Sequence, residues 1–159
     1  LGTVVLYPQG FAPPLGVDPT AADFTEEVLA DLVIQSRAPI KPLLLDQRKI
    51  AGLGNIYAAE ALWRAGIDPR RPASALRPTE VAALHVGITS VLSEAIGQLG
   101  TTIGDRITDY RPAATAGGLF QNHLAVYGRE RQPCERCGTA IERVKQAGRS
   151  TCFCPACQT

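Results

Sequence analysis

The amino-acid sequence predicts a mainly α-helical fold that ends in a small metal-bound β-hairpin. Three observations favour this fold class. Apolar residues recur at helical spacing through the first two thirds of the chain, glycine and proline residues separate these segments, and four cysteines form two Cys-x-x-Cys units near the end. We therefore expect helices first and a compact metal-bound unit last.

The first twenty residues read as the end of one domain and a linker. Residues 3–7 (Thr-Val-Val-Leu-Tyr) favour a short strand, but a single strand is not stable alone. Its sheet partners are therefore expected upstream of Leu1, and the lack of methionine also indicates a fragment or a processed product. Residues 8–20 hold four prolines and two glycines, which is typical of a linker and predicts a domain boundary.

Two helices are expected next. Apolar residues recur at helical spacing between residues 24 and 33, and Thr20 or Asp23 is placed to cap this helix. It should end near Arg37, because a following proline disfavours helical geometry. Pro42 suits the first turn of a short helix over residues 43–46.

A glycine turn and two more helices follow. Residues 52–55 (Gly-Leu-Gly-Asn) predict a tight turn, because glycine adopts backbone angles that other residues resist. One helix is expected over residues 56–65, ended by Gly66, and a long one over residues 78–97. The predicted apolar stripe of the long helix consists of Val81, Leu84, Ile88, Val91, Leu92, Ala95 and Ile96. Residues 101–123 read as irregular.

The cysteines near the end carry the strongest chemical signal. Two Cys-x-x-Cys units stand sixteen residues apart, and the loop between them is long enough to form a two-stranded hairpin. Two disulfides or unpaired thiols are the alternative. The chain has no other disulfide framework, which favours one structural zinc ion with four ligands: Cys134, Cys137, Cys154 and Cys157. Cys152 could replace Cys154, but the spacing to Cys157 favours Cys154.

The charges are segregated along the chain. The net charge of +1 by itself predicts no nucleic-acid partner, but residues 1–36 carry −5, residues 37–109 carry +2 and residues 110–159 carry +4. Phosphate binding depends on local clusters of Lys and Arg, so the basic metal-bearing end favours a nucleic-acid partner. No apolar run approaches the roughly 20 residues that span a bilayer, so we expect no membrane partner and no signal peptide.

The glycine turn before the third helix is a candidate anion site. Asn55 stands where backbone N–H groups are unpaired and the positive end of the helix dipole points outward. Its side chain could add a donor to a phosphate, and Arg48 and Lys49 could add charge. The alternative is that Asn55 only caps the helix, for which asparagine is a preferred residue.

Several segments of the chain match one protein family. They are Ile40-Lys-Pro-Leu-Leu-Leu-Asp-Gln47, the stretch from Ile50 to Pro69, Gly100-Thr-Thr-Ile103, Leu119-Phe-Gln121, Val126-Tyr-Gly-Arg129, and the stretch from Gly148 to Gln158. In these segments the chain resembles the C-terminal half of the formamidopyrimidine-DNA glycosylase/endonuclease VIII family of base-excision repair enzymes. These segments resemble the formamidopyrimidine (8-oxoguanine) branch of the family more closely than the endonuclease VIII branch. The resemblance covers about residues 20–159.

The resemblance implies a fold and a domain order. It implies a helix–two-turn–helix domain followed by a four-cysteine zinc finger, with the N-terminal catalytic β-sandwich missing. Residues 1–19 would be a remnant strand and linker of that domain, and residues 20–110 the helix–two-turn–helix domain. Residues 111–124 would be a lesion-recognition loop, and residues 125–159 the zinc finger. An insertion at 104–111 departs from the family's pattern and leaves the lesion preference open.

The resemblance also implies roles for four residues. Asn55 and Arg149 match residues that contact DNA phosphates at the lesion, and the match to Arg149 is also assigned as the proton donor for δ-elimination. Because arginine is hard to deprotonate, the phosphate contact is physically better founded. Arg37 and Lys41 match basic positions that contact DNA near the damaged nucleotide. For each of them the alternative is an ordinary surface cation.

The catalytic groups of the family have no match in this sequence. The family's nucleophile is an N-terminal proline, assisted by a glutamate and a lysine, and its amine forms a Schiff base with the sugar. Pro8, Pro13 and Pro14 are internal amides without a free lone pair, and nothing in the sequence around Lys41 indicates a lowered pKa. The full-length parent is therefore expected to excise oxidised purines as a glycosylase with AP lyase activity, and this chain is expected to lack that chemistry.

The expected partner is duplex DNA with a damaged or abasic site, and the expected cofactor is one structural zinc ion. The chain is expected to act as a monomer in the bacterial cytoplasm, associated with the nucleoid when bound. Two other functions stay open. One is a DNA-binding module without chemistry, which contacts phosphates rather than bases. The other is a zinc-ribbon protein-interaction domain with Phe153 and Leu119 as exposed anchors. In that case, raising the salt concentration would not weaken the affinity for the partner.

Overall fold

The computed structural model describes residues 14–98, 100 and 119–159. The predicted strand over residues 3–7 and the linker up to residue 13 lie outside the described residues, as does the expected loop up to residue 118. Within the described part, no helix is long and apolar enough to cross a membrane.

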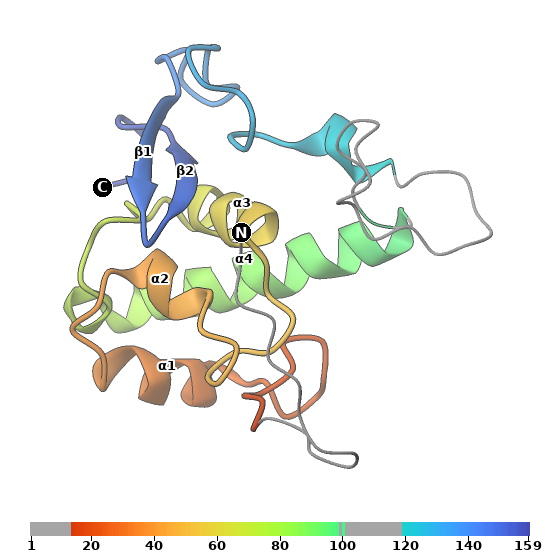
Figure 1. Cartoon of the computed structure of the whole chain (residues 1–159), viewed down its shortest axis with the longest axis vertical. Coiled ribbons are helices and arrows are strands. Elements are labelled where there is room, and N and C mark those ends of the chain that lie inside the picture. The colour runs from red at the N-terminus through yellow and green to blue at the C-terminus, as the bar shows by residue number, and fades with distance from the viewer. Residues whose placement is uncertain (1–13, 99, 101–118) are drawn as a thin grey trace.

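The described residues fold into four α-helices and a terminal hairpin (Figure 1). The helices are α1 (Glu26–Ile34), α2 (Ile40–Leu44), α3 (Asn55–Ala65) and α4 (Pro78–Gly97). Two short 3-10 helices, η1 (Ala73–Ala75) and η2 (Phe120–His123), lie in the connections. The strands β1 (Glu142–Gln146) and β2 (Arg149–Phe153) pair antiparallel, as the cysteine spacing predicts, with Val144 opposite Thr151.

The ends of the two longer helices confirm the glycine and proline signals. Gly66 follows α3 in the left-handed conformation with φ of 70°, and its N–H bonds back to the last turn. Pro78 begins α4, and the carboxylate of Glu80 accepts a hydrogen bond from the backbone N–H of Arg77, the residue before the helix. The predicted stripe of α4 is buried except at Ile96, which is 64% exposed.

The first two helices differ from the prediction at their starts. The cap of α1 is Thr25, whose hydroxyl accepts from the N–H of Val28, whereas Thr20 bonds to Asp18 in a separate turn. The helix α2 begins at Ile40 rather than after Pro42, because Pro42 is tolerated anywhere in the first turn, where N–H groups have no helical partner.

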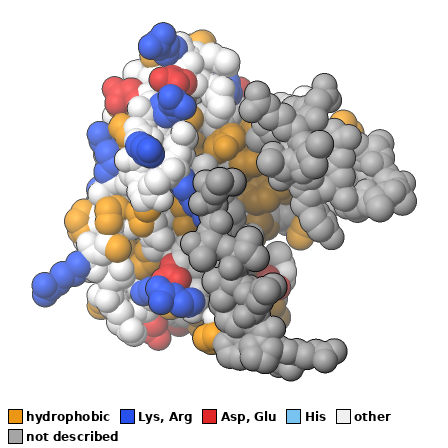
Figure 2. All heavy atoms as spheres, viewed as in Figure 1, with side chains coloured by type: hydrophobic (Ala, Val, Ile, Leu, Met, Phe, Trp, Pro, Cys, Tyr) orange, Lys and Arg blue, Asp and Glu red, His pale blue; other side chains and the backbone are white. Residues whose placement is uncertain are grey.

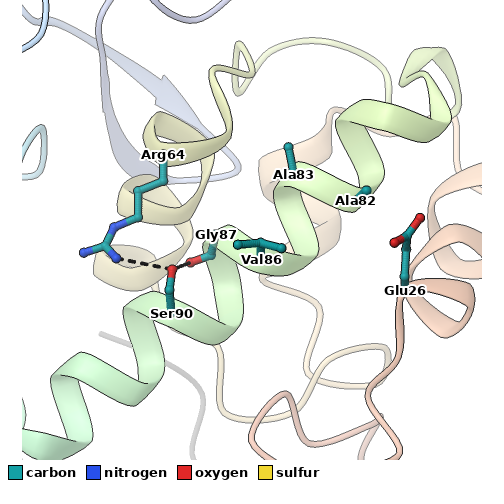
Figure 3. A pocket seen from close by; sticks show the side chains of 7 residues that line it. All are labelled: Glu26, Arg64, Ala82, Ala83, Val86, Gly87 and Ser90. Carbon is teal, nitrogen blue, oxygen red and sulfur yellow. Dashed lines mark hydrogen bonds between the residues drawn. The ribbon is translucent and has the colours of Figure 1, made fainter.

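The core is built around α3, which packs along α4. The two backbones approach so closely that a Cβ at Gly87 would lie 2.8 Å from the carbonyl oxygen of Ala61. Figure 3 shows Arg64 of α3 reaching to Ser90 of α4 beside this contact, at 3.2 Å. The shallow pocket at this point is otherwise lined mainly by small side chains and holds none of the predicted site residues.

The hairpin sits over α2 and α3 (Figure 1). A second buried cluster joins it to α3 through Ala59, Val126, Ile141 and the cysteines. Two arginines strengthen the contact by stacking on aromatic rings: Arg136 lies 4.1 Å from the ring centre of Trp63, and Arg70 lies 4.5 Å from that of Phe153. The zinc finger is therefore docked on the helical domain.

Candidate metal centre and nucleic-acid interface

The four predicted ligands converge at the end of the hairpin. The sulfur atoms of Cys134, Cys137, Cys154 and Cys157 all lie within 4.8 Å of one another. The sulfur–sulfur distance is 3.5 Å between Cys137 and Cys154, and 4.0 Å between Cys134 and Cys157. Four sulfurs at about 2.3 Å from a tetrahedral zinc ion would lie about 3.8 Å apart, so the geometry fits zinc.

The electrostatics of these thiols also favour a cation. Hydrogen bonds from the hydroxyl and the backbone of Thr139 lower the pKa of Cys137 to about 6, which favours the thiolate that metals bind. The neighbouring sulfur of Cys137, with burial, raises the pKa of Cys157 to about 12. Four crowded thiolates repel one another, and a divalent cation removes this repulsion. The chain therefore binds one zinc ion through four cysteines.

The fifth cysteine lies outside the metal group. Cys152 is buried in β2 opposite Arg143, so Cys154 is the ligand, as the spacing predicts. Gln158 holds the second Cys-x-x-Cys turn in place, because its side chain accepts from the N–H of Cys154 and donates to the carbonyl of Ile67 after α3. No local pattern predicts this role of Gln158, because glutamine side chains are usually exposed.

The tip of the hairpin and the helical domain meet at a buried lysine. Lys41 is 1% exposed, and its ammonium donates to three acceptors: the side-chain oxygen of Asn55 at 2.8 Å, the carbonyl of Ser150 at 2.9 Å and the hydroxyl of Thr151 at 2.8 Å. The side-chain nitrogen of Asn55 also donates to the carbonyl of Ser150, at 3.1 Å. We call this group of four residues the junction.

The expectation that nothing lowers the pKa of Lys41 is wrong. Burial lowers it to about 8, because a charged ammonium loses solvation in the interior. Cys152 opposes this change and the positive charge of Arg149 adds to it. The sequence could not show this, because burial of Lys41 depends on the hairpin, more than a hundred residues further along the chain.

Asn55 is not the cap of its helix. Gly54 occupies the cap position, no side chain caps the helix, and Asn55 is the first helical residue. Its partly exposed carboxamide instead bonds to the junction. The structure therefore replaces the capping interpretation with one in which Asn55 joins the turn to the hairpin at the positive end of α3.

Two predicted arginines are exposed, and one of them lies beside the junction. Arg149 begins β2 directly before Ser150, and its guanidinium makes no hydrogen bond or ion pair within the described residues. Arg37 is exposed between α1 and α2 and is not part of the junction. Arg48 is bound to Asp46 at 2.9 Å and is not a free cation. Figure 2 shows several Lys and Arg side chains over the hairpin on this face.

One residue that the sequence reading missed joins the zinc finger to α3. Glu60 is 2% exposed, and its carboxylate accepts from the N–H groups of Ala125, Val126 and Tyr127 at 2.8, 3.0 and 2.8 Å. Burial raises its pKa, while these three donors oppose the rise. The available signal was a lone carboxylate within the apolar run from Ala58 to Leu62.

One of the two anchors expected for a protein-interaction domain is not exposed. Phe153 is fully buried and its ring packs under Arg70, so it cannot serve as an exposed anchor. Leu119, the other expected anchor, is 59% exposed.

Comparisons with known proteins agree on one family. The sequence profile described as the formamidopyrimidine-DNA glycosylase H2TH domain matches residues 15–106, and that of the zinc finger found in FPG and IleRS matches residues 131–159. Formamidopyrimidine-DNA glycosylase from Chloroflexus aggregans is 50% identical over 143 residues, which cover 90% of this chain and 50% of the relative. The enzyme of that name from Paracoccus denitrificans is 47% identical, covering 99% of this chain and 57% of the relative. The chain spans about half the length of the curated relatives it matches.

Solved structures show the same relationship. The crystal structure of MutM (Fpg) from Thermus thermophilus superposes with a TM-score of 0.86 at 45% identity, covering 91% of this chain and 54% of the other. Lactococcus lactis Fpg in complex with DNA containing an abasic site gives a TM-score of 0.81 at 38% identity, covering 92% of this chain and 52% of the other.

Proposed function

Because the chain belongs to the formamidopyrimidine-DNA glycosylase family, we propose that it is the part of a base-excision repair enzyme that grips damaged DNA. The observation that carries the proposal is the junction, which brings Asn55 at the start of α3 next to Ser150 of the zinc hairpin. Two elements that could each contact a phosphate are held as one surface.

The exposed groups of this surface suit phosphate binding. The start of α3 offers unpaired N–H groups and the positive end of the helix dipole. Asn55 adds a neutral donor, and the exposed guanidinium of Arg149 adds a charge that can bind phosphate with two hydrogen bonds. We assign these two residues to the phosphates of the damaged strand, and Arg37 to a more distant phosphate. These contacts position DNA without reading its sequence.

The partner is proposed to be duplex DNA with a damaged or abasic site. Relatives of this chain carry the name formamidopyrimidine-DNA glycosylase, and solved relatives hold Fapy-dG or abasic-site DNA. In the whole enzyme, excision of oxidised purines followed by AP lyase chemistry would act on the nucleotide that this surface holds out of the duplex. We further propose residues 20–110 as the helix–two-turn–helix domain, 111–124 as the lesion loop and 125–159 as the zinc finger.

Asn55→Ala and Arg149→Ala test the proposed contacts separately. Both variants should bind duplex DNA about tenfold more weakly, with unchanged helix content. Their salt dependence should differ. Loss of a charged contact reduces the slope of log K against log salt by about 0.9, whereas loss of a neutral donor leaves it unchanged. Fluorescence anisotropy titrations at salt concentrations from about 50 to about 200 mM measure both the affinity and its dependence on salt.

Arg131→Ala is the control, because it removes an exposed arginine of the zinc finger that makes no side-chain ion pair within the described residues. It should retain nearly full affinity. Equal losses in all three variants would mean that overall charge, rather than the assigned contacts, binds DNA. Full DNA affinity in the folded Asn55→Ala variant would mean that Asn55 serves the fold only.

A further inference from the structure

We propose that Lys41 is a positioning residue for DNA binding: it orients the Asn55 carboxamide and fixes it to the zinc hairpin without contacting DNA itself. The inference rests on the proposed function, because it concerns how the phosphate contact of Asn55 is built.

The first argument is the hydrogen-bonding capacity of Lys41. An ammonium group has three protons and no lone pair. All three face acceptors at 2.8–2.9 Å, on α3 and on β2, and the side chain is 1% exposed. No proton is left for a phosphate oxygen. Lys41 therefore cannot bind DNA directly in this arrangement, although its charge lies directly behind the residue that is assigned to do so.

The second argument is the orientation of the carboxamide. Because the ammonium can only donate, the oxygen of the Asn55 side chain must face Lys41 and its nitrogen must face away. One of the two protons on that nitrogen is bound to the carbonyl of Ser150. The other makes no hydrogen bond within the described residues and is available to a phosphate. Without Lys41, a rotated carboxamide would present its oxygen and repel the phosphate.

The third argument is the unbalanced charge. No carboxylate within the described residues forms an ion pair with Lys41, and the charged or titratable groups that act on it are Arg149 and Cys152 of β2. A buried ammonium with only neutral acceptors is poorly compensated. A phosphate bound at Asn55 would supply the missing negative charge, so phosphate binding and Lys41 protonation should favour each other.

A double-mutant cycle tests the inference on the full chain with zinc bound. Lys41→Met keeps the length and apolar stem of the side chain and removes its charge. We expect Lys41→Met to bind duplex DNA about tenfold more weakly than the parent, but to change affinity less than about twofold in an Asn55→Ala background. Lys41→Arg should not restore affinity, because a planar guanidinium cannot place three donors as the ammonium does.

The DNA affinity of the folded variant separates positioning from a structural role. Lys41→Met removes the cost of a buried charge but leaves three acceptors without their donor, so we expect a modest fall in its melting temperature. At a temperature where both proteins are folded, the variant should bind one equivalent of zinc while its DNA affinity falls. If Lys41 served the fold alone, the folded variant would bind DNA as tightly as the parent.

The pH profile gives a second readout. Burial lowers the pKa of Lys41 in the folded chain to about 8, whereas the ordinary pKa of lysine is 10.5. Between these two pH values the unfolded chain binds more protons than the folded chain, so folding stability should rise with pH over this range. DNA affinity should move the other way. Since phosphate binding favours the protonated amine, affinity should fall by up to about tenfold between pH 8 and 9, and this decrease should be absent in Lys41→Met.

The outcomes distinguish this inference from the proposed function. If the parent binds DNA and Asn55→Ala weakens binding but Lys41→Met does not, the inference is wrong and the proposed function stands. Equal losses from Lys41→Met with and without Asn55 would also overturn it, because Lys41 would then act independently. If the parent does not bind DNA, both are wrong.

Discussion

Removal of the metal is expected to unfold residues 134–157 and to abolish DNA binding, while α1, α3 and α4 stay folded. The hairpin has only two five-residue strands, which are not stable alone, and its ligands repel one another without a cation. The main core lies within the helices and contains none of the cysteines. Unfolding the hairpin would also remove Ser150 and Arg149 from the DNA-binding surface.

Chelation followed by circular dichroism and anisotropy measures this effect. The helical signal should be largely kept, while affinity falls by on the order of a hundredfold or more, as expected when several phosphate contacts are lost. Cys154→Ala should reproduce the chelated state. Cys152→Ala is its matched control, since this buried cysteine is outside the metal group, and it should bind one equivalent of zinc. Unchanged DNA affinity in the metal-free chain would contradict the role of the hairpin.

Glu60→Leu is expected to have the second-largest effect, on stability. The substitution would leave three N–H groups, at residues 125–127, without acceptors. Each unsatisfied buried donor costs about 1–3 kcal/mol, but the N–H of Tyr127 is only partly buried and Leu removes the cost of burying a carboxylate, so we expect a net loss of about 3–5 kcal/mol in the free energy of unfolding. Urea denaturation measures the loss, and hydrogen exchange should show faster exchange at these three amides.

A graded series makes the Glu60 prediction sharper. Glu60→Gln keeps the oxygen that accepts from Val126 and Tyr127 but places an amide nitrogen against the N–H of Ala125, so its loss should be smaller. Glu94→Gln, at a solvent-accessible ion pair with Arg64, should lose less than about 1 kcal/mol. Similar losses at Glu60 and Glu94 would show that the three buried hydrogen bonds are not what holds the zinc finger on α3.

Local signals predicted much of this molecule. The cysteine spacing identified the metal ligands and the hairpin, because both depend on residues close in sequence. Gly66 and Pro78 marked helix ends correctly, since capping is also local. The cap of α1 was predicted at Thr20 or Asp23 but is Thr25, because Thr20 bonds to Asp18 in a separate turn and the hydroxyl of Thr25 accepts from the N–H of Val28.

Long-range contacts set the limit of the sequence reading. Asn55 was recognised from its place after a glycine turn, but its partners Ser150 and Lys41 come from other elements. Lys41 was expected to contact DNA, with an ordinary surface cation as the alternative, and its burial was not predicted because it depends on contacts outside its own helix. Glu60 was overlooked for the same reason, as its three donors lie sixty-five or more residues away. These are tertiary contacts without a local sequence pattern.

The central claim is that the joined helix and zinc-hairpin surface binds DNA through phosphates at a damaged site. Anisotropy titration of the zinc-loaded chain with a short duplex bearing an abasic-site analogue, against the same duplex undamaged, tests it most directly. We predict tighter binding to the damaged duplex, and binding that weakens steeply as salt increases. Absence of binding to either duplex by the folded chain, or affinity that salt does not change, would contradict the claim.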